Sequence, residues 1–197
     1  RFGDAEQLGW QLANDAPPLE EDFEFEKSAL SLPDPAPDVP EILLVTEEDG
    51  QPESLALRGQ PVHIASANAS DGRSPVFDVS DPVMAFSRGC IDDAVARAMM
   101  KHDCAHTSLN TSDVGDALVA LAKAHDVEAI ATAYAPVGPM ADRIAGAARK
   151  LADAGITLHR VARTYDREAW PHATKGFFGL KKKIPALVKS LGLEGSA

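Results

Sequence analysis

The sequence predicts an α/β fold of the Rossmann-like, doubly wound type, with a mainly parallel sheet of about five strands and helices on both faces. Short apolar runs recur from Ile42 onward, and segments with helical periodicity separate them. A proline-rich acidic stretch precedes the first run and has neither pattern. Strands that alternate with helices are joined by right-handed crossovers, so neighbouring strands should point the same way.

Three regions follow from these patterns. Residues 1–40 carry ten acidic and two basic side chains and many prolines, which predicts an acidic arm or linker. This arm is either an extended segment that wraps onto a neighbour or a plain disordered tail. Residues 41–165 are expected to form the α/β domain, and residues 166–197 a basic, amphipathic helical tail.

The first half of the domain contains two strand signals. The branched run at 42–45 ends in a polar loop at 46–50 and predicts a buried strand. Residues 62–65 predict a second strand, followed by a loop at 66–72. Apolar residues at helical spacing then predict a helix from about Ile91 to Lys101.

The second half of the domain repeats the alternation more clearly. Asp113 occupies a typical N-cap position before a helix that reaches about Ala122. A strand at 127–132, a loop at 134–139 and an alanine-rich helix at 140–154 follow. Gly155 is expected to close that helix in a left-handed conformation, and 156–161 is the next strand.

Composition excludes several classes of function. The formal net charge of -11 argues against a general binder of nucleic acid or of membrane surfaces, because phosphates would be repelled. The sequence has no apolar run long enough to cross a bilayer, so no membrane association is expected. Cys90 and Cys104 are too few for a disulfide framework, which favours a reducing, cytoplasmic location. Because the sequence begins at Arg1, we expect it to be part of a longer polypeptide.

A ligand site is expected where the strands end. In open parallel sheets, ligands bind beyond the carboxyl ends of the strands. The predicted cofactor-binding residues at this edge are Thr46, Glu47, Ser66, Tyr134, Pro136 and Gly138. No Gly-x-Gly-x-x-Gly and no Walker-type phosphate loop is present, and the acids after the first strand, interpreted as solvated surface groups, would repel phosphate.

Two further motifs could carry chemistry. His102, Cys104 and His106 alternate as metal ligands on a strand would, but no fourth ligand is evident nearby and a polar connection between helix and strand explains the pattern better, so no metal site is predicted. A Gly-x-Ser-x-Gly elbow is missing, and no catalytic residue is predicted. In the tail, an apolar stripe lies opposite lysines; it comprises Trp170, Phe177, Phe178, Leu180, Ile184, Leu187, Val188 and Leu191. The tail either caps the core or presents a basic face to an acidic arm or a phosphate backbone.

The run 113–161 resembles the later half of the α/β antenna domain of DNA photolyases and cryptochromes, and the tail motif WPHATKGFF at 170–178 resembles segments of bacterial photolyase-like flavoproteins. The family loop Tyr-Glu-Pro-Tyr is matched by Tyr134 and Pro136; the resemblance also includes Gly138 and adds Asp142 to the cofactor-binding residues. Ala135 replaces the acid that can hold a folate antenna. Loss of that polar partner argues against folate binding.

The resemblance implies the α/β domain of a photolyase-like or cryptochrome-like flavoprotein that performs light-dependent DNA repair or light sensing. The domain itself would be structural or light-harvesting, and any deoxyribodipyrimidine photo-lyase activity would require a flavin domain outside this sequence. FAD would therefore be bound by an adjacent helical domain or a partner chain, and DNA would be contacted only indirectly. The alternatives are a free-standing Rossmann-like domain that binds a nucleotide or small molecule, and a module that docks a partner.

Overall fold

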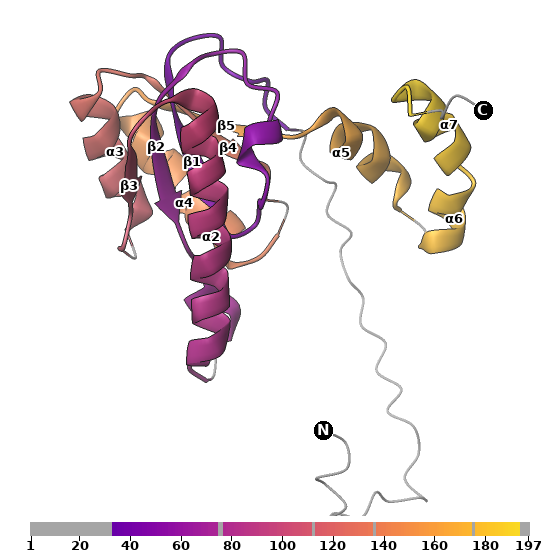
Figure 1. Cartoon of the computed structure of the whole chain (residues 1–197), viewed down its shortest axis with the longest axis horizontal. Coiled ribbons are helices and arrows are strands. Elements are labelled where there is room, and N and C mark those ends of the chain that lie inside the picture. The colour runs from indigo at the N-terminus through magenta and orange to yellow at the C-terminus, as the bar shows by residue number, and fades with distance from the viewer. Residues whose placement is uncertain (1–32, 75–76, 112, 136, 175, 194–197) are drawn as a thin grey trace, which may run out of the picture.

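The computed structural model describes residues 33–74, 77–111, 113–135, 137–174 and 176–193. Its centre is a five-stranded, all-parallel sheet, which confirms the predicted fold class (Figure 1). In spatial order β3-β2-β1-β4-β5, the strands are His106–Ser108, Pro61–Ala67, Glu41–Thr46, Ala129–Ala133 and Thr157–Val161. The order reverses direction between β1 and β4, which is where a doubly wound sheet opens a crevice.

Helices cover both faces of this sheet. Helix α2 (Asp81–His102) packs on one face, where Leu43, Ile64 and Val95 belong to one buried cluster. Helices α3 (Val114–Ala124) and α4 (Pro139–Asp153) pack side by side on the other, where Leu44, Leu118 and other apolar side chains form the larger cluster. Every residue of β1 is buried, because it is the central strand and both faces are covered.

Local signals fix the ends of α3 and α4 as the sequence predicts. Oδ1 of Asp113 accepts the backbone N–H of Asp116 at 3.2 Å, so Asp113 is the N-cap of α3. Gly155 follows α4 with a φ of 77°, a left-handed conformation that glycine adopts without strain.

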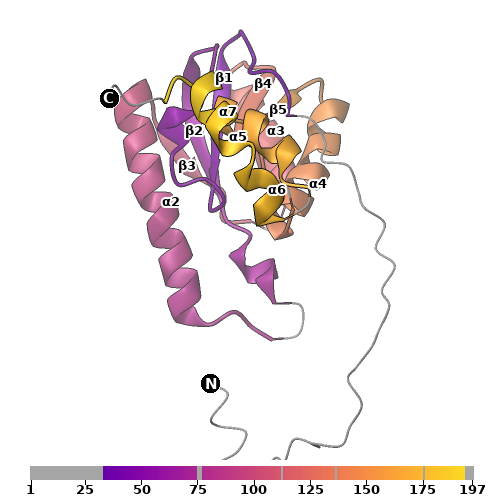
Figure 2. The same cartoon turned by 90° about the vertical axis from the view of Figure 1, so that its right-hand side faces the viewer.

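Two elements differ from the prediction. Helix α2 begins at Asp81 rather than about Ile91, and its first half extends past the sheet, where Phe86 is 74% exposed (Figure 2). That half has no apolar stripe, because it has no sheet to cover, and periodicity could not reveal it. Strand β3 was expected as a polar connection; it is three residues long and pairs with β2.

The described end of the acidic arm lies along the outer edge of β5. The backbone N–H of Asp34 donates to the Arg160 carbonyl at 2.9 Å, and the Arg160 N–H donates to Oδ2 of Asp34 at 2.8 Å. The N–H of Gly59 donates to the Pro37 carbonyl at 2.8 Å. Residues 33–37 therefore cover an open sheet edge, and the predicted arm before Pro33 lies outside the described residues.

The tail forms several short helices instead of one long amphipathic helix. They are α5 (Thr164–Ala169), a 3-10 turn η3 (Trp170–His172), α6 (Phe177–Lys181) and α7 (Ile184–Ser190). The Trp170 ring lies 5.5 Å from that of Tyr134, which anchors the start of the tail on the domain. Helices α6 and α7 lie farther out (Figure 1). In the described part of the chain, no helix has the length and apolar character needed to cross a membrane.

Candidate functional site

A pocket of about 460 Å³ opens at the carboxyl ends of β2 and β3, beside α2. Its volume is in the range of small-molecule sites. Ser66 and Ser108 come from the two strands, and Arg88 and Asp92 from one face of α2. The remaining lining residues are Ala67, Asn68, Asp71, Met84, Ile91, Leu109, Asn110, Thr111 and Arg143. Hydroxyl, amide, acidic and basic groups thus meet in one cavity.

The turn after β2 is held rigid by a hydrogen-bond network. Nδ2 of Asn68 donates to Oγ of Ser87 at 3.1 Å, and the Ser70 N–H donates to Oδ1 of Asn68 at 2.8 Å. The Ser70 and Ser87 hydroxyls are 2.6 Å apart and both are buried. The turn is therefore fixed against α2, and the pocket wall that it forms is preorganised.

Arg143 ties α4 to the same turn. Its Nη2 donates to both carboxylate oxygens of Asp71 at 2.7 Å, and its Nη1 donates to the Asn68 carbonyl at 2.6 Å. One guanidinium nitrogen thus bridges both carboxylate oxygens while the other binds the backbone, which holds the Arg143 side chain in place. Because Asp71 already neutralises Arg143, this arginine holds the pocket wall in place and is less available to bind a ligand.

Arg88 is the cation that remains available in the pocket. Within the residues that the structure describes, it makes no ion pair and no side-chain hydrogen bond. Asp92 lies one helical turn farther along α2, on the same face. The pair offers an anion-binding group and a carboxylate acceptor on the same wall.

Ser66, which lines the pocket, is paired with a histidine that lies outside the pocket lining. Oγ of Ser66 lies 2.9 Å from Nε2 of His106 on the neighbouring strand. Burial lowers the pKa of His106 below its ordinary value, and the nearby Asp92 carboxylate opposes this shift. A neutral His106 can accept the Ser66 hydroxyl proton in a hydrogen bond, which leaves the serine oxygen able to accept one from a ligand.

A second pocket, of about 340 Å³, lies beyond the end of β4. It is lined by Tyr134, Gly138 and Asp142, three of the predicted residues, together with Ala135, Val137, Ala141, Ile144, Ala145 and Arg160. The structure therefore brings these three together, but it places Ser66 in the other pocket, toward the opposite side of the sheet. Pro136 lies outside the described residues.

Thr46 and Glu47 line neither of these two pockets. Thr46 is buried, and its Oγ1 has no hydrogen-bond partner among the described residues. Oε1 of Glu47 accepts the Ala69 N–H at 2.8 Å, and burial raises the pKa of this carboxyl. The role of Glu47 is thus to hold the end of β2 against the end of β1.

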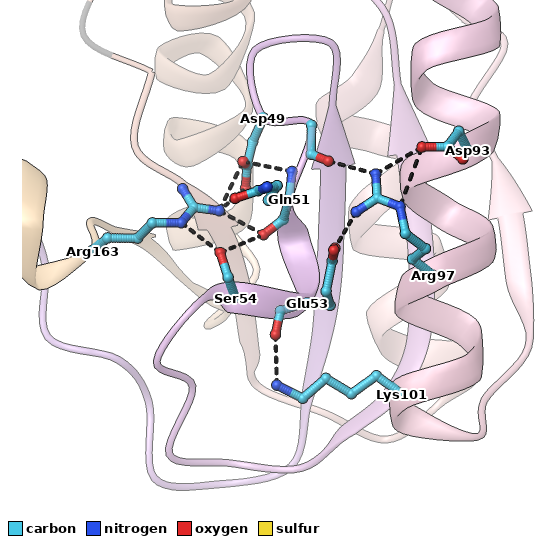
Figure 3. A network of polar contacts seen from close by, with 9 residues as sticks. Asp49, Gln51, Glu53, Ser54, Asp93, Arg97, Lys101 and Arg163 are labelled. Carbon is cyan, nitrogen blue, oxygen red and sulfur yellow. Dashed lines mark hydrogen bonds and ion pairs between the residues drawn. The ribbon is translucent and has the colours of Figure 1, made fainter.

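The loop after β1 carries acids that are paired with arginines, not merely solvated as expected (Figure 3). Nη2 of Arg163 donates to the two oxygens of Asp49 at 2.8 and 3.0 Å, and Asp49 is only 9% exposed. On the other side, Arg97 of α2 contacts both Glu53 and Asp93. Of the three acids after the strand, only Glu48 is largely exposed. These ion pairs join the loop after β1 to α2 on one side and to the start of α5 on the other, so their role is structural.

The alternating motif at 102–106 spans the end of α2, a connection and the start of β3. Burial raises the pKa of the Cys104 thiol, which disfavours the thiolate that a metal needs. Over residues 33–193, apart from the positions that the structure leaves undescribed, no three His, Cys, Asp or Glu side chains are grouped closely enough to hold a metal ion.

Sequence reasoning found Ser66 but missed Arg88, Asp92 and Arg143. Arg88 and Asp92 have the i,i+4 spacing of one helix face, but the helix was expected to begin after Arg88. Arg143 reaches the pocket from an element 75 residues away from Asn68 in sequence, and only the tertiary structure brings them together.

Comparison with known proteins adds no relative: no family model, no curated protein and no solved structure matches the chain.

Proposed function

We propose that the chain is a binding domain for a polar, anionic small molecule of the nucleotide class, held in the pocket beside α2. The observation that carries this proposal is Arg88, which has no ion-pair or hydrogen-bond partner for its side chain among the described residues and lines the same cavity as Ser66 and Asp92. A phosphate fits the guanidinium, and sugar hydroxyls or base amides fit the serine, asparagine and aspartate groups. No covalent chemistry is assigned to the pocket.

Calorimetric titration with AMP and with adenosine tests this proposal. Both ligands should bind the wild-type chain, AMP more tightly, because only AMP carries the phosphate that Arg88 would meet. Arg88→Glu should weaken AMP binding by about tenfold or more, which corresponds to about 1.4 kcal/mol, and should leave adenosine binding nearly unchanged. Lys123→Glu, an equal charge change at the end of α3, is the matched control. Equal effects of the two variants, or no binding of either ligand, would contradict the proposal.

The second candidate is the α/β domain of a photolyase-like or cryptochrome-like flavoprotein, with a structural or light-harvesting role. It is favoured by the pocket beyond β4, because Tyr134, Gly138 and Asp142, which the resemblance nominates, line the same cavity. The residues of the resemblance also form one continuous unit, α3-β4-α4-β5. FAD would be bound by an adjacent helical domain or a partner chain, and DNA only through it.

Absorption spectroscopy separates the two candidates. A light-harvesting domain should retain a chromophore that absorbs in the near ultraviolet or the visible when it is purified, or after incubation with a folate. Asp142→Ala should then lower the chromophore content, whereas Arg88→Glu should not. A colourless protein that takes up no folate would exclude the antenna role and leave only a structural one.

A further inference from the structure

Helices α6 and α7 present apolar side chains that the rest of the described chain does not cover. Phe177 is 64% exposed, Phe178 is 77% exposed and Ile184 is 42% exposed. Neither helix contains a buried residue. Both lie at the outer side of the molecule, beyond α5 (Figures 1 and 2). Helices this short are not stable by themselves, so an apolar covering would stabilise them.

The same surface is basic. Lys181 ends α6, and Lys182 and Lys183 connect it to α7; all three are exposed, and in the described part of the chain none of them makes an ion pair. From residue 160 to residue 197 the sequence holds eight basic and three acidic residues. We call the surface formed by Phe177, Phe178, Lys181–Lys183 and Ile184 the tail face. A segment that binds to the tail face should therefore combine apolar side chains with acidic ones.

One segment of this chain has that composition. Residues 19–27 read LEEDFEFEK, with five acids, one lysine, one leucine and two phenylalanines. Phe23 and Phe25 alternate with Asp22, Glu24 and Glu26, so an extended segment can turn its rings to one side and its carboxylates to the other.

The point at which the chain enters the structure brings this segment within reach of the tail face. Asp34 is bound to Arg160 at the edge of β5, three residues before Arg163, the N-cap of α5. Lys27 lies seven positions before Asp34 in the sequence, a stretch that spans up to about 24 Å when extended. Tethering at this position gives the segment a local concentration of the order of millimolar near the tail.

We propose that residues 19–27 dock on the tail face of the same chain. Phe23 and Phe25 pack against Phe177, Phe178 and Ile184, and the neighbouring carboxylates pair with the three lysines. Because these charges are exposed, the contact weakens as salt is added. The first 40 residues carry a net charge of -8 and residues 41–165 a net charge of -6, with 11 basic and 17 acidic residues, so the tail is the basic surface available to the arm.

Paramagnetic relaxation in the full chain tests this docking. A spin label is attached at Asp22→Cys in a chain in which Cys90→Ser and Cys104→Ala remove the two native thiols. We expect the amide signals of Phe177, Phe178 and Lys181–Lys183 to lose intensity, and those of α3 to keep theirs. Replacing all three lysines with glutamate should restore the lost signals, whereas the control Lys123→Glu should not.

A charge exchange gives the sharper result. Adding Glu20→Lys, Glu21→Lys and Glu24→Lys to the triple-glutamate variant should bring the signal loss back, because the pairing is re-formed with its signs reversed. The tail variants leave the core intact, since α6 and α7 bury nothing in it. Signal loss confined to other surfaces, or no loss at all, overturns the proposal. Loss in a labelled and unlabelled mixture that vanishes on dilution assigns the tail face to a second copy and also overturns it.

Discussion

Glu41 provides the most quantitative test of the packing around the central strand. Its side chain is completely buried at the start of β1, and neither carboxylate oxygen has a hydrogen-bond partner among the described residues. Burial raises the pKa of this carboxyl from 4.5 to about 7, because the charged form loses its hydration. The folded protein therefore holds a proton that the unfolded chain releases at lower pH.

The direction and size of the effect follow from this difference. Between the two pKa values the folded state binds more protons than the unfolded state, so the free energy of unfolding falls as the pH rises. The shift in the pKa of Glu41 lowers the free energy of unfolding by about 3 kcal/mol in total, and this full loss is reached above pH 7. Glu41→Gln removes the titrating group but keeps the shape of the side chain. Relative to the wild type, the free energy of unfolding of the variant should therefore rise by up to about 3 kcal/mol between pH 5 and pH 8.

Urea unfolding of both proteins over this pH range measures the effect, because the difference between them cancels all other titrating groups. Glu128→Gln makes the same chemical change at an exposed position just before β4 and is the control. A difference between wild type and Glu41→Gln that stays constant within about 0.5 kcal/mol over the range would refute the burial of a protonated carboxyl.

Three further predictions concern stability. Leu118→Ala deletes a fully buried side chain of α3 and should cost about 2–5 kcal/mol of unfolding free energy by urea denaturation, whereas Val137→Ala at an exposed site should cost little. Arg163→Ala leaves the buried Asp49 carboxylate without its ion pair and should lower the free energy of unfolding by about 1–3 kcal/mol. Hydrogen exchange in the loop after β1 should become faster, and unchanged exchange would count against a structural role of this ion pair. A Cβ at Gly59 would lie 2.0 Å from the Val39 carbonyl oxygen, so Gly59→Ala should lower the thermal midpoint while Gly50→Ala, with open space around it, should not; equal midpoints would contradict this contact.

The sequence was sufficient for the elements whose signals are local. Strand β1 contains a continuous apolar run, β4 and β5 lie between clear helical segments and turn signals, and Asp113 and Gly155 fix helix ends through their own side-chain or backbone chemistry. Strand β3 escaped prediction because its three polar residues acquire strand geometry only by pairing with β2. The first half of α2 escaped because it covers no sheet.

The candidate site was only partly predictable for a related reason. The rule that ligands bind beyond the carboxyl ends of strands nominated Ser66, Tyr134 and Gly138, and all three line pockets. It could not tell that α4 divides that edge, so that Ser66 and Tyr134 face different cavities. Thr46 was nominated by position alone, and its side chain is buried in the body of the sheet.

Amide NMR titration of the full chain with AMP shows whether the pocket at the ends of β2 and β3 binds an anionic, nucleotide-like molecule, as we propose. We expect saturable shifts at Ser66, Asn68, Ser108 and Asn110, with weaker changes elsewhere. Saturable shifts confined to Tyr134 and Asp142, or no shifts at millimolar nucleotide, would contradict it.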